Sequence, residues 1–346
     1  MPKRITIKEI ASKAEVSIGT VDRVLHNRGR VAQATKDKIL EIAKKGNYSS
    51  NIYARNLKLN RTYKVAVVLS NDNPYWDKHR VGIKRALNEY EAMGFTQREI
   101  EVTSLNEETR ASAIKQALES DADGVVLSPN MLSRDGAGAK MLSETKIPFV
   151  FVDATMEQMN NLSFIGQDTY QSGTMAGKIL SNAYDNYFCI WVVTQSASDL
   201  QKMTIIKRIE GLEAFFQTTK KHINISKVNL ETDGLTMAEL KAQLLKESKP
   251  VHLFIPHSKS YTILDEIHPI RKQCNMRIIG YDLIDSNIKC LKNGWIDYLI
   301  DQQPIKQGYL AIQALYKHLI LKSDVAKNQY LPLDIITKEN LMYCDY

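Results

Sequence analysis

From Thr62 onward, short runs of apolar, β-branched residues alternate with stretches whose apolar residues recur at helical spacing, such as Val81, Ile83, Leu87 and Tyr90. Near-continuous apolar runs are typical of strands that are covered on both faces, as in a parallel sheet. The alternation predicts a doubly wound α/β structure, in which ligands bind outside the carboxyl ends of the strands. The runs, in chain order, are KVAVVLS, IEVTSL, DGVVLSP, FVFVDA, FCIWVVT, ISKVNLE, VHLFIP, RIIGYD and DYLIDQ.

Polar or aromatic side chains follow many of these predicted strands. Carboxylates, amides and a hydroxyl at so many strand ends predict a polar ligand that carries several hydroxyl groups. The two aromatic residues alone are equally compatible with packing at the start of a helix. The candidates are Asn73, Tyr75, Trp76, Asn130, Asp153, Gln195 with its neighbour Ser196, His257, Asp282 and Gln302.

The positive charge of the chain is concentrated at its N-terminal end. Residues 1–61 hold 14 Lys and Arg against 5 Asp and Glu, a net charge of +9, whereas the whole chain carries +7. The remainder therefore has a net charge of −2. A cationic segment of domain size favours a polyanionic partner such as nucleic acid, because neutralised phosphates release condensed counterions.

Length and composition limit the other possibilities. A chain of 346 residues is long enough for two or three domains. No run approaches the roughly 20 apolar residues that a membrane span requires, and the start MPKRITIKEI lacks the apolar region of a signal peptide. The four cysteines are scattered, without a C-x-x-C pair. We therefore expect a cytoplasmic protein with no metal, cofactor or disulfide framework.

The first fifty residues predict three short helices around a small core. Thr6 and Glu9 form a capping-box pattern before a first helix, and Ser17 is a candidate N-cap for a second. A third helical pattern ends at Gly46, which we expect to be the C′ residue. The tight break at Glu15 and Val16 between the first two helices is the signature of a helix-turn-helix. The expected core includes Ile7, Ile10, Ala11, Ala14, Val21, Val24, Leu25, Ile39, Ile42 and Ala43.

This segment, TIKEIASKAEVSIGTVDRVLHNRGRVAQATKDKILEIAKKGNY, resembles the DNA-binding domain of the LacI/GalR family of bacterial transcription regulators. The resemblance implies that the helix after Ser17 lies in the major groove with its N-terminal residues at the base edges. It places Ile18 and Gly19 at base-reading positions and Arg23 at the shared arginine position. Backbone-contacting positions are Thr6, Ser17, Thr20, His26, Arg30 and Thr35.

Several residues depart from the family pattern. Ile18 and Gly19 offer no side-chain hydrogen bond, so their direct readout is limited to apolar contact with a thymine methyl. Asp22 can accept from cytosine N4 or pair with Arg23 or Arg28, and we favour the pairing. Ala32 stands where a capping Ser or Thr is expected before the third helix.

The stretch NIYARNLKLNRT, residues 51–62, has helical spacing but is too short to be stable alone. It is either a plain linker or, as the resemblance implies, a hinge helix that forms on DNA and inserts leucines into the minor groove. Asn51, Ala54 and Leu57 are the candidate contacts. The proline that often precedes such a hinge is replaced by Ser50.

The remainder resembles the periplasmic-binding-protein-like domain of the same family and ribose-type binding proteins, chiefly through NDNPYW, IGQDTYQSG, GYD and IDQQP. The resemblance implies two lobes, joined by three crossovers, that close on a small molecule. It implies that Tyr75 and Trp76 sandwich a sugar ring and that Asp153 and Asp282 accept hydroxyl hydrogens. It adds Arg208 and Asp168 as candidates, gives Gln302 a terminal amide contact, and places His257 where Asn is usual.

Two other classes of protein compete with a regulator. An enzyme that processes sugars fits the scaffold, but the chain has no G-x-S-x-G, no H-E-x-x-H and no clustered Cys and His, and DGAGAKM is not a complete phosphate loop. A free solute-binding protein is disfavoured by the basic N-terminal segment. Turnover of a bound sugar would favour the enzyme, and a salt-sensitive, sequence-selective DNA shift would favour the regulator.

The sequence therefore predicts a homodimeric, ligand-controlled transcription regulator that binds a near-palindromic operator in double-stranded DNA. We expect a helix-turn-helix domain at 1–48, a hinge at 49–61 and an effector domain at 62–346. Within the effector domain, lobe 1 covers about 62–164 and 303–332, and lobe 2 covers about 165–302 and 333–346. The effector is expected to be a monosaccharide or a derivative.

Overall fold

A computed structural model describes residues 5–25, 29–46, 48, 61–102, 106–132, 136–182, 188–196, 203–219 and 223–345. The chain forms two compact units, residues 1–60 and residues 61–346. Within the described ranges, no helix is long and apolar enough to cross a membrane.

The first unit contains three helices, α1 (Ile7–Ala14), α2 (Ile18–Leu25) and α3 (Gln33–Lys45). The predicted capping box is present: the Thr6 hydroxyl accepts from the backbone N–H of Glu9, whose carboxylate accepts from the backbone N–H of Thr6. Glu15 has a left-handed backbone conformation, φ 58°, which turns the chain between α1 and α2. The buried core is Ile10, Ala11, Ala14, Val21, Val24, Ile39 and Ala43.

Gly46 ends α3, but it is not the predicted C′ residue. Gly46 is the C-cap of α3 with φ −88°, a conformation that any residue adopts, and not a left-handed C′ residue. A Cβ atom there would lie 2.3 Å from Cγ2 of Ile5. The glycine is therefore required by the close approach of the segment before α1.

The second unit contains two six-stranded sheets with the same strand order. The first sheet has the order β11-β5-β4-β3-β1-β2, and all its neighbouring strands are parallel. Its strands are β1 (Tyr63–Ser70), β2 (Phe95–Val102), β3 (Gly124–Leu127), β4 (Phe149–Val152), β5 (Ser163–Gly166) and β11 (Asn328–Tyr330).

The second sheet has the order β12-β10-β9-β8-β6-β7 and is parallel except for the antiparallel pair of β10 and β12. Two such sheets with crossover helices confirm the predicted two-lobed, doubly wound α/β class. The strands are β6 (Cys189–Thr194), β7 (Asn224–Asn229), β8 (Val251–Phe254), β9 (Arg277–Tyr281), β10 (Tyr298–Asp301) and β12 (Asp334–Ile336).

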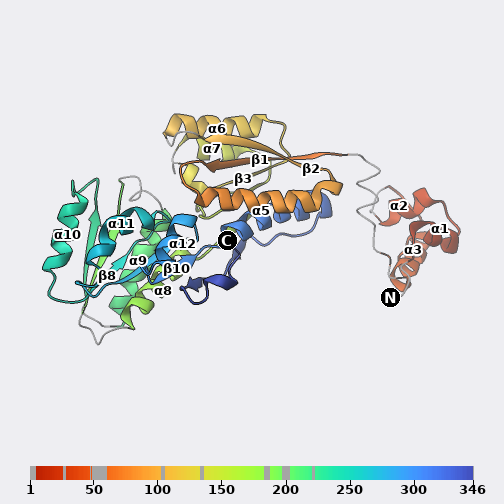
Figure 1. The fold of residues 1–346 in the computed structure, drawn as a ribbon. Coiled ribbons are helices and arrows are strands. Elements are labelled where there is room, and N and C mark those ends of the chain that lie inside the picture. Colours follow the sequence, from red (N-terminus) through yellow and green to blue (C-terminus); the bar gives the residue numbers. More distant parts are fainter. Residues whose placement is uncertain are drawn as a thin grey trace. The chain divides into compact units, whose positions relative to one another are not determined.

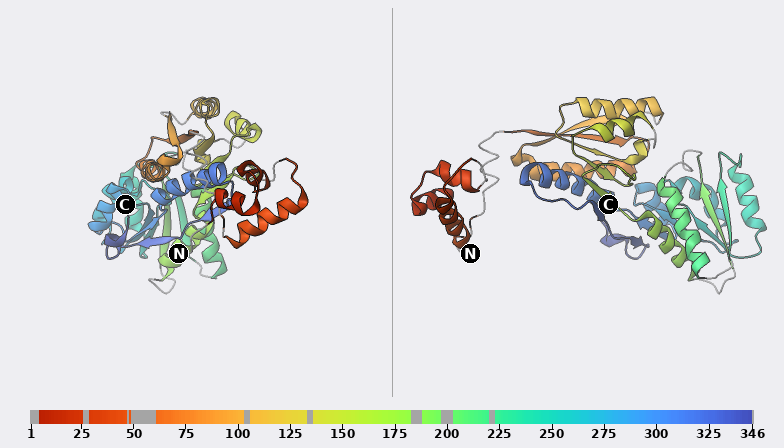
Figure 2. Two further views of the ribbon diagram at one scale, coloured as in Figure 1. Left: turned by 90° about the vertical axis from the view of Figure 1, so that its right-hand side faces the viewer. Right: turned by 180° about the vertical axis from the view of Figure 1, so that it is seen from behind.

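Helices cover both faces of each sheet (Figure 1). In lobe 1, the lobe of the first sheet, α6 (Glu107–Glu119) and α7 (Ala137–Glu144) lie on one face. Helices α5 (Tyr75–Tyr90) and α13 (Pro304–Tyr316) lie side by side on the other (Figures 1 and 2). Short helical turns are η1 (Glu91–Met93), η2 (Pro129–Met131), η4 (His268–Ile270), η5 (Lys317–Leu321) and η6 (Leu341–Tyr343).

Lobe 2, the lobe of the second sheet, is covered in the same way. Trp191 and Val193 of β6 face a core formed with α10, α11 and α12, whereas Ile190 and Val192 face one formed with α8 and α9. Strands buried on both faces explain why the sequence shows continuous apolar runs. These helices are α8 (Thr169–Ser181), α9 (Met203–Thr218), α10 (Met237–Lys246), α11 (Ser260–Ile267) and α12 (Asp285–Lys292).

The chain passes between the lobes three times, after β5, after β10 and after β11. The side-chain amide of Gln167, in the first crossover, donates to the carbonyl oxygens of Asp301 at 2.7 Å and Pro332 at 2.6 Å. One buried glutamine therefore ties all three crossovers together.

Some sequence expectations differ from the structure. β2 begins at Phe95 rather than near Ile100, and the three-residue strands β11 and β12 had no predicted counterpart. Val81 is 42% exposed, so it does not belong to the buried face of α5 as its spacing suggested.

Candidate DNA-binding helix and ligand cavity

Helix α2 begins after Ser17, whose hydroxyl oxygen accepts from the backbone N–H of Thr20 at 3.1 Å. The two hydroxyls of Ser17 and Thr20 lie 2.9 Å apart. The first helical residues, Ile18 and Gly19, are exposed, and Ile18 exposes 47% of its surface. An exposed isoleucine at a helix start has no role in the core of this unit, so it is free to contact another molecule.

The other described DNA-binding candidates also remain at the surface. The Arg23 Nε–H donates to the carbonyl oxygen of Gly19 at 3.2 Å, which holds the guanidinium along the exposed side of α2. The candidates Thr6, Ser17, Ile18, Gly19, Arg23 and Arg30 are exposed, and Thr20, Asp22 and Thr35 are half-buried. His26, Asn51, Ala54 and Leu57 lie outside the described residues.

In the second unit, the carboxyl ends of the strands of both lobes border one cavity of about 80 Å³. At about 10–15 Å³ for each water molecule, it has room for on the order of six waters, the size of one small ligand. It lies where strand order reverses in each sheet, the usual ligand position in doubly wound folds. Its lining includes the predicted residues Asn73, Tyr75, Trp76, Asn130, Asp153, Arg208, His257, Asp282 and Gln302.

Asp153 is the centre of the lobe 1 wall. Its carboxylate accepts from the Tyr75 hydroxyl at 2.7 Å and from the Asn130 side-chain amide at 2.8 Å. Tyr75 and Trp76 begin α5 and are both buried, with ring centroids 5.1 Å apart. This wall therefore combines a carboxylate in a fixed orientation with two aromatic rings.

Asp282 is the centre of the lobe 2 wall. Its two carboxylate oxygens accept from the Gln302 side-chain amide at 3.0 and 2.9 Å. The Gln302 side-chain oxygen accepts in turn from the guanidinium of Arg208, which also donates to the carbonyl oxygen of Pro256 at 2.9 Å. The guanidinium carbon of Arg208 lies 3.8 Å from the centre of the Tyr281 ring, so stacking and hydrogen bonds together fix the cation.

Burial shifts the ionisation of these groups. It raises the pKa of the Asp282 carboxyl well above its ordinary value, an effect opposed by Arg208 and increased by the negative charge of Asp301. Burial also raises the pKa of the Tyr75 hydroxyl, and the nearby carboxylates of Asp153 and Asp282 add to this rise. Tyr75 is therefore a neutral hydroxyl that donates to Asp153.

Contacts reach from one lobe to the other at the cavity edge. The Asn73 side-chain amide, which follows β1, donates to the Ser258 hydroxyl, which follows β8. The Asn73 side-chain oxygen accepts from the backbone N–H of Tyr75 at 3.1 Å. Asn73 thus orients the start of α5 and contacts lobe 2 with one side chain.

Two predicted ligand residues lie elsewhere. The Asp168 carboxylate caps α8, accepting from the backbone N–H of Gln171 at 3.0 Å, and the Gln195 side-chain oxygen accepts from the Thr262 hydroxyl at 2.8 Å. Neither is among the described residues that line the cavity. Sequence analysis missed other lining residues, for which only their positions after strands or on α9 gave a signal: Ser70, Asp72, Met131, Thr204, Ile205 and Ser258.

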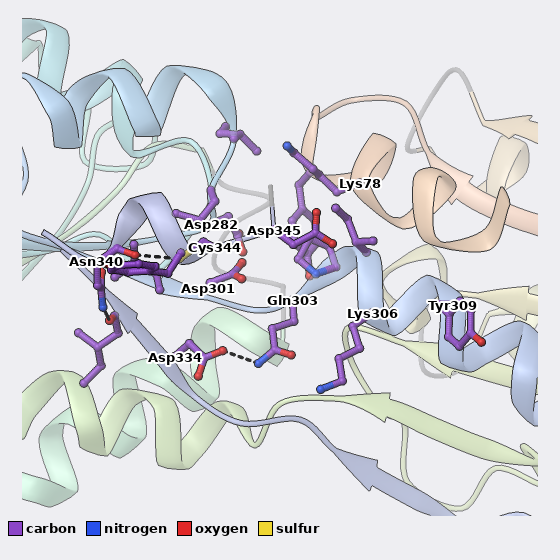
Figure 3. A pocket seen from close by; sticks show the side chains of 18 of the residues that line it. Lys78, Asp282, Asp301, Gln303, Lys306, Tyr309, Asp334, Asn340, Cys344 and Asp345 are labelled. Carbon is purple, nitrogen blue, oxygen red and sulfur yellow. Dashed lines mark hydrogen bonds between the residues drawn. The ribbon is translucent and has the colours of Figure 1, made fainter. Parts of the chain in front are cut away.

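A second, larger groove of about 590 Å³ lies between the lobes (Figure 3). Lys78 and Lys306 line it from lobe 1, and Asp301 and Asp334 line it from lobe 2. Asp282 contributes to both the groove and the cavity. No group of three or more His, Cys, Asp or Glu in the described part of the chain is arranged to hold a metal ion.

Two family matches agree with this arrangement. Residues 6–51 match the bacterial regulatory proteins of the lacI family, and residues 65–323 match the periplasmic binding protein domain. Together they define the class of protein, a helix-turn-helix DNA-binding unit followed by a periplasmic-binding-protein-like domain. The chain belongs to the LacI family of bacterial transcription regulators.

Individual relatives support the assignment. The transcriptional regulator RegA of Clostridium acetobutylicum is 31% identical over 157 residues, and the chain spans about half of its length, 45%. The transcriptional repressor PurR of Haemophilus influenzae is 27% identical over 348 residues, 95% of each chain. A crystal structure of a putative LacI regulator from Bacteroides fragilis superposes with a TM-score of 0.71 at 27% identity, covering 82% of this chain and 100% of that one.

Membership of this family confirms three predictions: a regulator rather than an enzyme, a helix-turn-helix that binds DNA, and a domain that binds a ligand. Because such regulators act on chromosomal DNA, it also places the chain in the cytoplasm.

Proposed function

We propose that this chain is a repressor that binds a near-palindromic DNA operator as a homodimer. Its DNA affinity changes when a monosaccharide or a close derivative binds between the two lobes. The observation that carries the proposal is the cavity whose opposite walls are centred on Asp153 and Asp282. Each carboxylate is aligned by neighbouring side chains and can accept hydrogens from ligand hydroxyl groups.

The charges and shapes of the walls favour a neutral polyol. Arg208 is the one buried cation among the described lining residues and is already bonded to Gln302 and Pro256, so a ligand phosphate or carboxylate would lie beside the two buried carboxyl groups of Asp153 and Asp282 with no second cation to pair with. The buried Arg208 Nε–H has no partner among the described residues and can donate to a ligand oxygen. Tyr75 and Trp76 offer aromatic surface to the apolar face of a sugar ring.

The cavity also supplies the means of control. Its ligand-facing groups come from both lobes, so a ligand that contacts both walls stabilises one lobe arrangement over others. In allosteric proteins such coupling is typically worth about 1–3 kcal/mol, or roughly 5–150-fold in affinity for the second partner. We propose that the change in lobe arrangement reaches DNA through the hinge at 49–61, which joins a domain at 1–48 to one at 62–346.

The DNA side of the proposal is supported by the net charge of +9 in residues 1–61 and by the exposed start of α2. Ile18 and Gly19 are proposed to face base edges, with Ile18 against a thymine methyl; Arg23 is proposed to lie beside them, and Arg30 to contact the DNA backbone. From the hinge sequence, Ala54 and Leu57 are proposed to enter the minor groove.

Selection from a library of randomised duplexes tests DNA recognition. We expect enrichment of a two-fold symmetric site, binding that weakens steeply with salt, and weaker binding by Leu57→Ala. Enrichment of unsymmetric sequences would contradict the dimer, and failure to retain any duplex at low salt would contradict the function.

A thermal-shift screen of neutral monosaccharides, nucleosides and polyols tests the ligand. A compound that binds only the folded state raises the melting temperature. We expect Asp282→Asn to reduce the shift strongly and Asp285→Asn, a substitution of an exposed aspartate three residues away, to retain it. A shift that is equal in all three proteins would exclude the cavity as the binding site.

A further inference from the structure

Gln307, in the first turns of α13, connects three elements through one fully buried side-chain amide. Its Oε1 accepts from the backbone N–H of Asp153 at 2.7 Å and lies 3.3 Å from Nε2 of His79. Its Nε2 donates to the carbonyl oxygen of Gln302 at 2.8 Å. Nothing in the sequence marked Gln307 or His79, because neither follows a predicted strand.

The two backbone contacts reach both halves of the cavity. Asp153 carries the carboxylate of the lobe 1 wall, and Gln302 orients Asp282 and accepts from Arg208 in the lobe 2 wall. Gln307 therefore spans from the end of β4 in one sheet to the crossover that follows β10 in the other. No other described side chain is bonded to the backbone of both residues.

The backbone at both contact points needs such support. Asp153 has φ 70°, and Gln303, directly after Gln302, has φ 55°. Left-handed conformations cost non-glycine residues of order 1 kcal/mol or more and persist where surrounding contacts fix them. The amide of Gln307 supplies one contact at each of these two turns.

The third contact extends the connection to the aromatic rings. Burial lowers the pKa of His79, which favours a neutral ring with one N–H; its Nε2 lies 3.3 Å from Gln307 Oε1 and its Nδ1 lies 3.4 Å from the carbonyl oxygen of Tyr75, two acceptors that share this hydrogen. The His79 ring lies 4.9 Å from Tyr75 and 5.1 Å from Trp76, measured between centroids. The aromatic wall is thus packed on a ring that Gln307 contacts.

We propose that Gln307 is a positioning residue for the effector site: it fixes the backbone of Asp153 and of Gln302 relative to each other, so that both cavity walls are set by one amide. The inference rests on the proposed function only in taking the cavity as the effector site. Its alternative is a purely local role, in which Gln307 fills space and satisfies polar groups beside α13.

Hydrogen exchange of the ligand-free, full-length protein separates these roles. Gln307→Met keeps the length of the side chain and removes the donor and the acceptor. The matched control is Gln313→Met on the same helix, where the amide makes only a 3.5 Å contact with the Tyr90 hydroxyl. Loss of one buried hydrogen bond predicts roughly tenfold faster exchange at the amides it holds.

For Gln307→Met we expect exchange to accelerate in the segments around Asp153 and around Gln302, whereas exchange in α13 should not change. For Gln313→Met we expect no acceleration in either segment. Acceleration confined to α13, a uniform acceleration, or none would overturn the proposal. If Gln307→Met does not fold, Gln307→Leu replaces it, because leucine also lacks the donor and the acceptor. Both segments should accelerate in that variant as well, and no change in either of them would also overturn the proposal. Because no ligand is added, either failure leaves the proposed function to its own tests.

Discussion

Asp153 and Asp282 occupy equivalent positions in the two lobes. Each is the first residue after a strand, β4 or β9, and each has a left-handed backbone, with φ 70° and 72°. The backbone N–H of Asp153 donates to Ile165 at 3.1 Å, and that of Asp282 donates to Ile300 at 3.0 Å, in each case to the next strand of the sheet. Both lobes therefore use the same turn to direct a carboxylate into the cavity.

Replacing either carboxylate should weaken effector binding. Hydrogen bonds to charged groups contribute about 1.5–3 kcal/mol, so Asp153→Asn and Asp282→Asn are each expected to raise the dissociation constant by roughly 10–150-fold. Calorimetry with the compound found by thermal shift measures this change, and the DNA affinity of the ligand-free protein should stay the same. Asp285→Asn is the control, and an unchanged dissociation constant in either cavity variant would remove that residue from the site.

Glycines allow the helices of each lobe to meet backbone to backbone. In lobe 2, a Cβ at Gly173 of α8 would lie 1.9 Å from the carbonyl oxygen of Arg208 on α9, and one at Gly211 would lie 2.0 Å from that of Tyr170. In lobe 1, a Cβ at Gly82 of α5 would lie 1.8 Å from the carbonyl oxygen of Ile305. The lobe 2 contact also bears on the cavity, because it places the backbone of Arg208, one of the residues that line it.

Gly173→Ala should therefore affect both stability and the site. Overpacking typically costs about 1–3 kcal/mol, which exceeds the gain of about 1 kcal/mol from replacing glycine in a helix. We expect a lower denaturant midpoint of unfolding and weaker binding of the effector, because Arg208 must move. A variant that is as stable as the parent and binds the effector equally well would show that the two helices separate without cost.

Features that depend on local pattern could be predicted from the sequence. The capping box of Thr6 and Glu9 needs only four consecutive residues, and β1 or β9 needs only a continuous apolar run. Parallel strands end at one edge of a sheet, so residues directly after them, such as Asp153 and Asp282, could be grouped from the order of strands along the chain.

Features that depend on tertiary contacts could not. β11 and β12 have three residues each and are strands only because a sheet edge pairs with them. Asp168 follows a strand, as Asp153 and Asp282 of the cavity lining do, yet its carboxylate caps α8. Gln307 lies on a helix, and its role follows from three contacts that join residues up to 228 positions apart.

Gly19 gives a test of the first unit, because its surroundings contrast with those of Gly173. It lies in the first turn of α2, and its added Cβ would have nothing nearer than the Ser17 hydroxyl at 3.8 Å. Gly19→Ala should therefore stabilise residues 1–60 by up to about 1 kcal/mol, through helix propensity alone. Thermal unfolding followed by circular dichroism measures the change. The same substitution should alter DNA selectivity if position 19 faces base edges, and unaltered selectivity would place it away from them.

The pH dependence of stability should report Asp301, which faces the interlobe groove (Figure 3). Burial raises its pKa to about 6 from an ordinary value of 3.8; the backbone N–H of Gln303 and the charge of Lys78 oppose the rise, and Asp334 adds to it. The folded state thus holds this proton more tightly than the unfolded state. Because the folded state resists losing this proton, ionisation of Asp301 lowers the free energy of unfolding by up to roughly 3 kcal/mol as pH rises from about 4 to about 6.

Asp301→Asn removes this ionisation, while its side-chain oxygen can still accept from Gln303. The free energy of unfolding of the variant should match that of the parent near pH 4 and exceed it at pH 7 by up to the same roughly 3 kcal/mol, because the pKa of about 6 already includes the attraction to Lys78. Denaturant unfolding at a series of pH values gives the two curves, and their difference reports the ionisation of Asp301 together with the part of the Asp282 shift that the charge of Asp301 causes. Parallel curves between pH 4 and 6 would mean that Asp301 titrates in the folded protein at its ordinary pKa, with the groove hydrated deeply enough to keep its carboxylate in water.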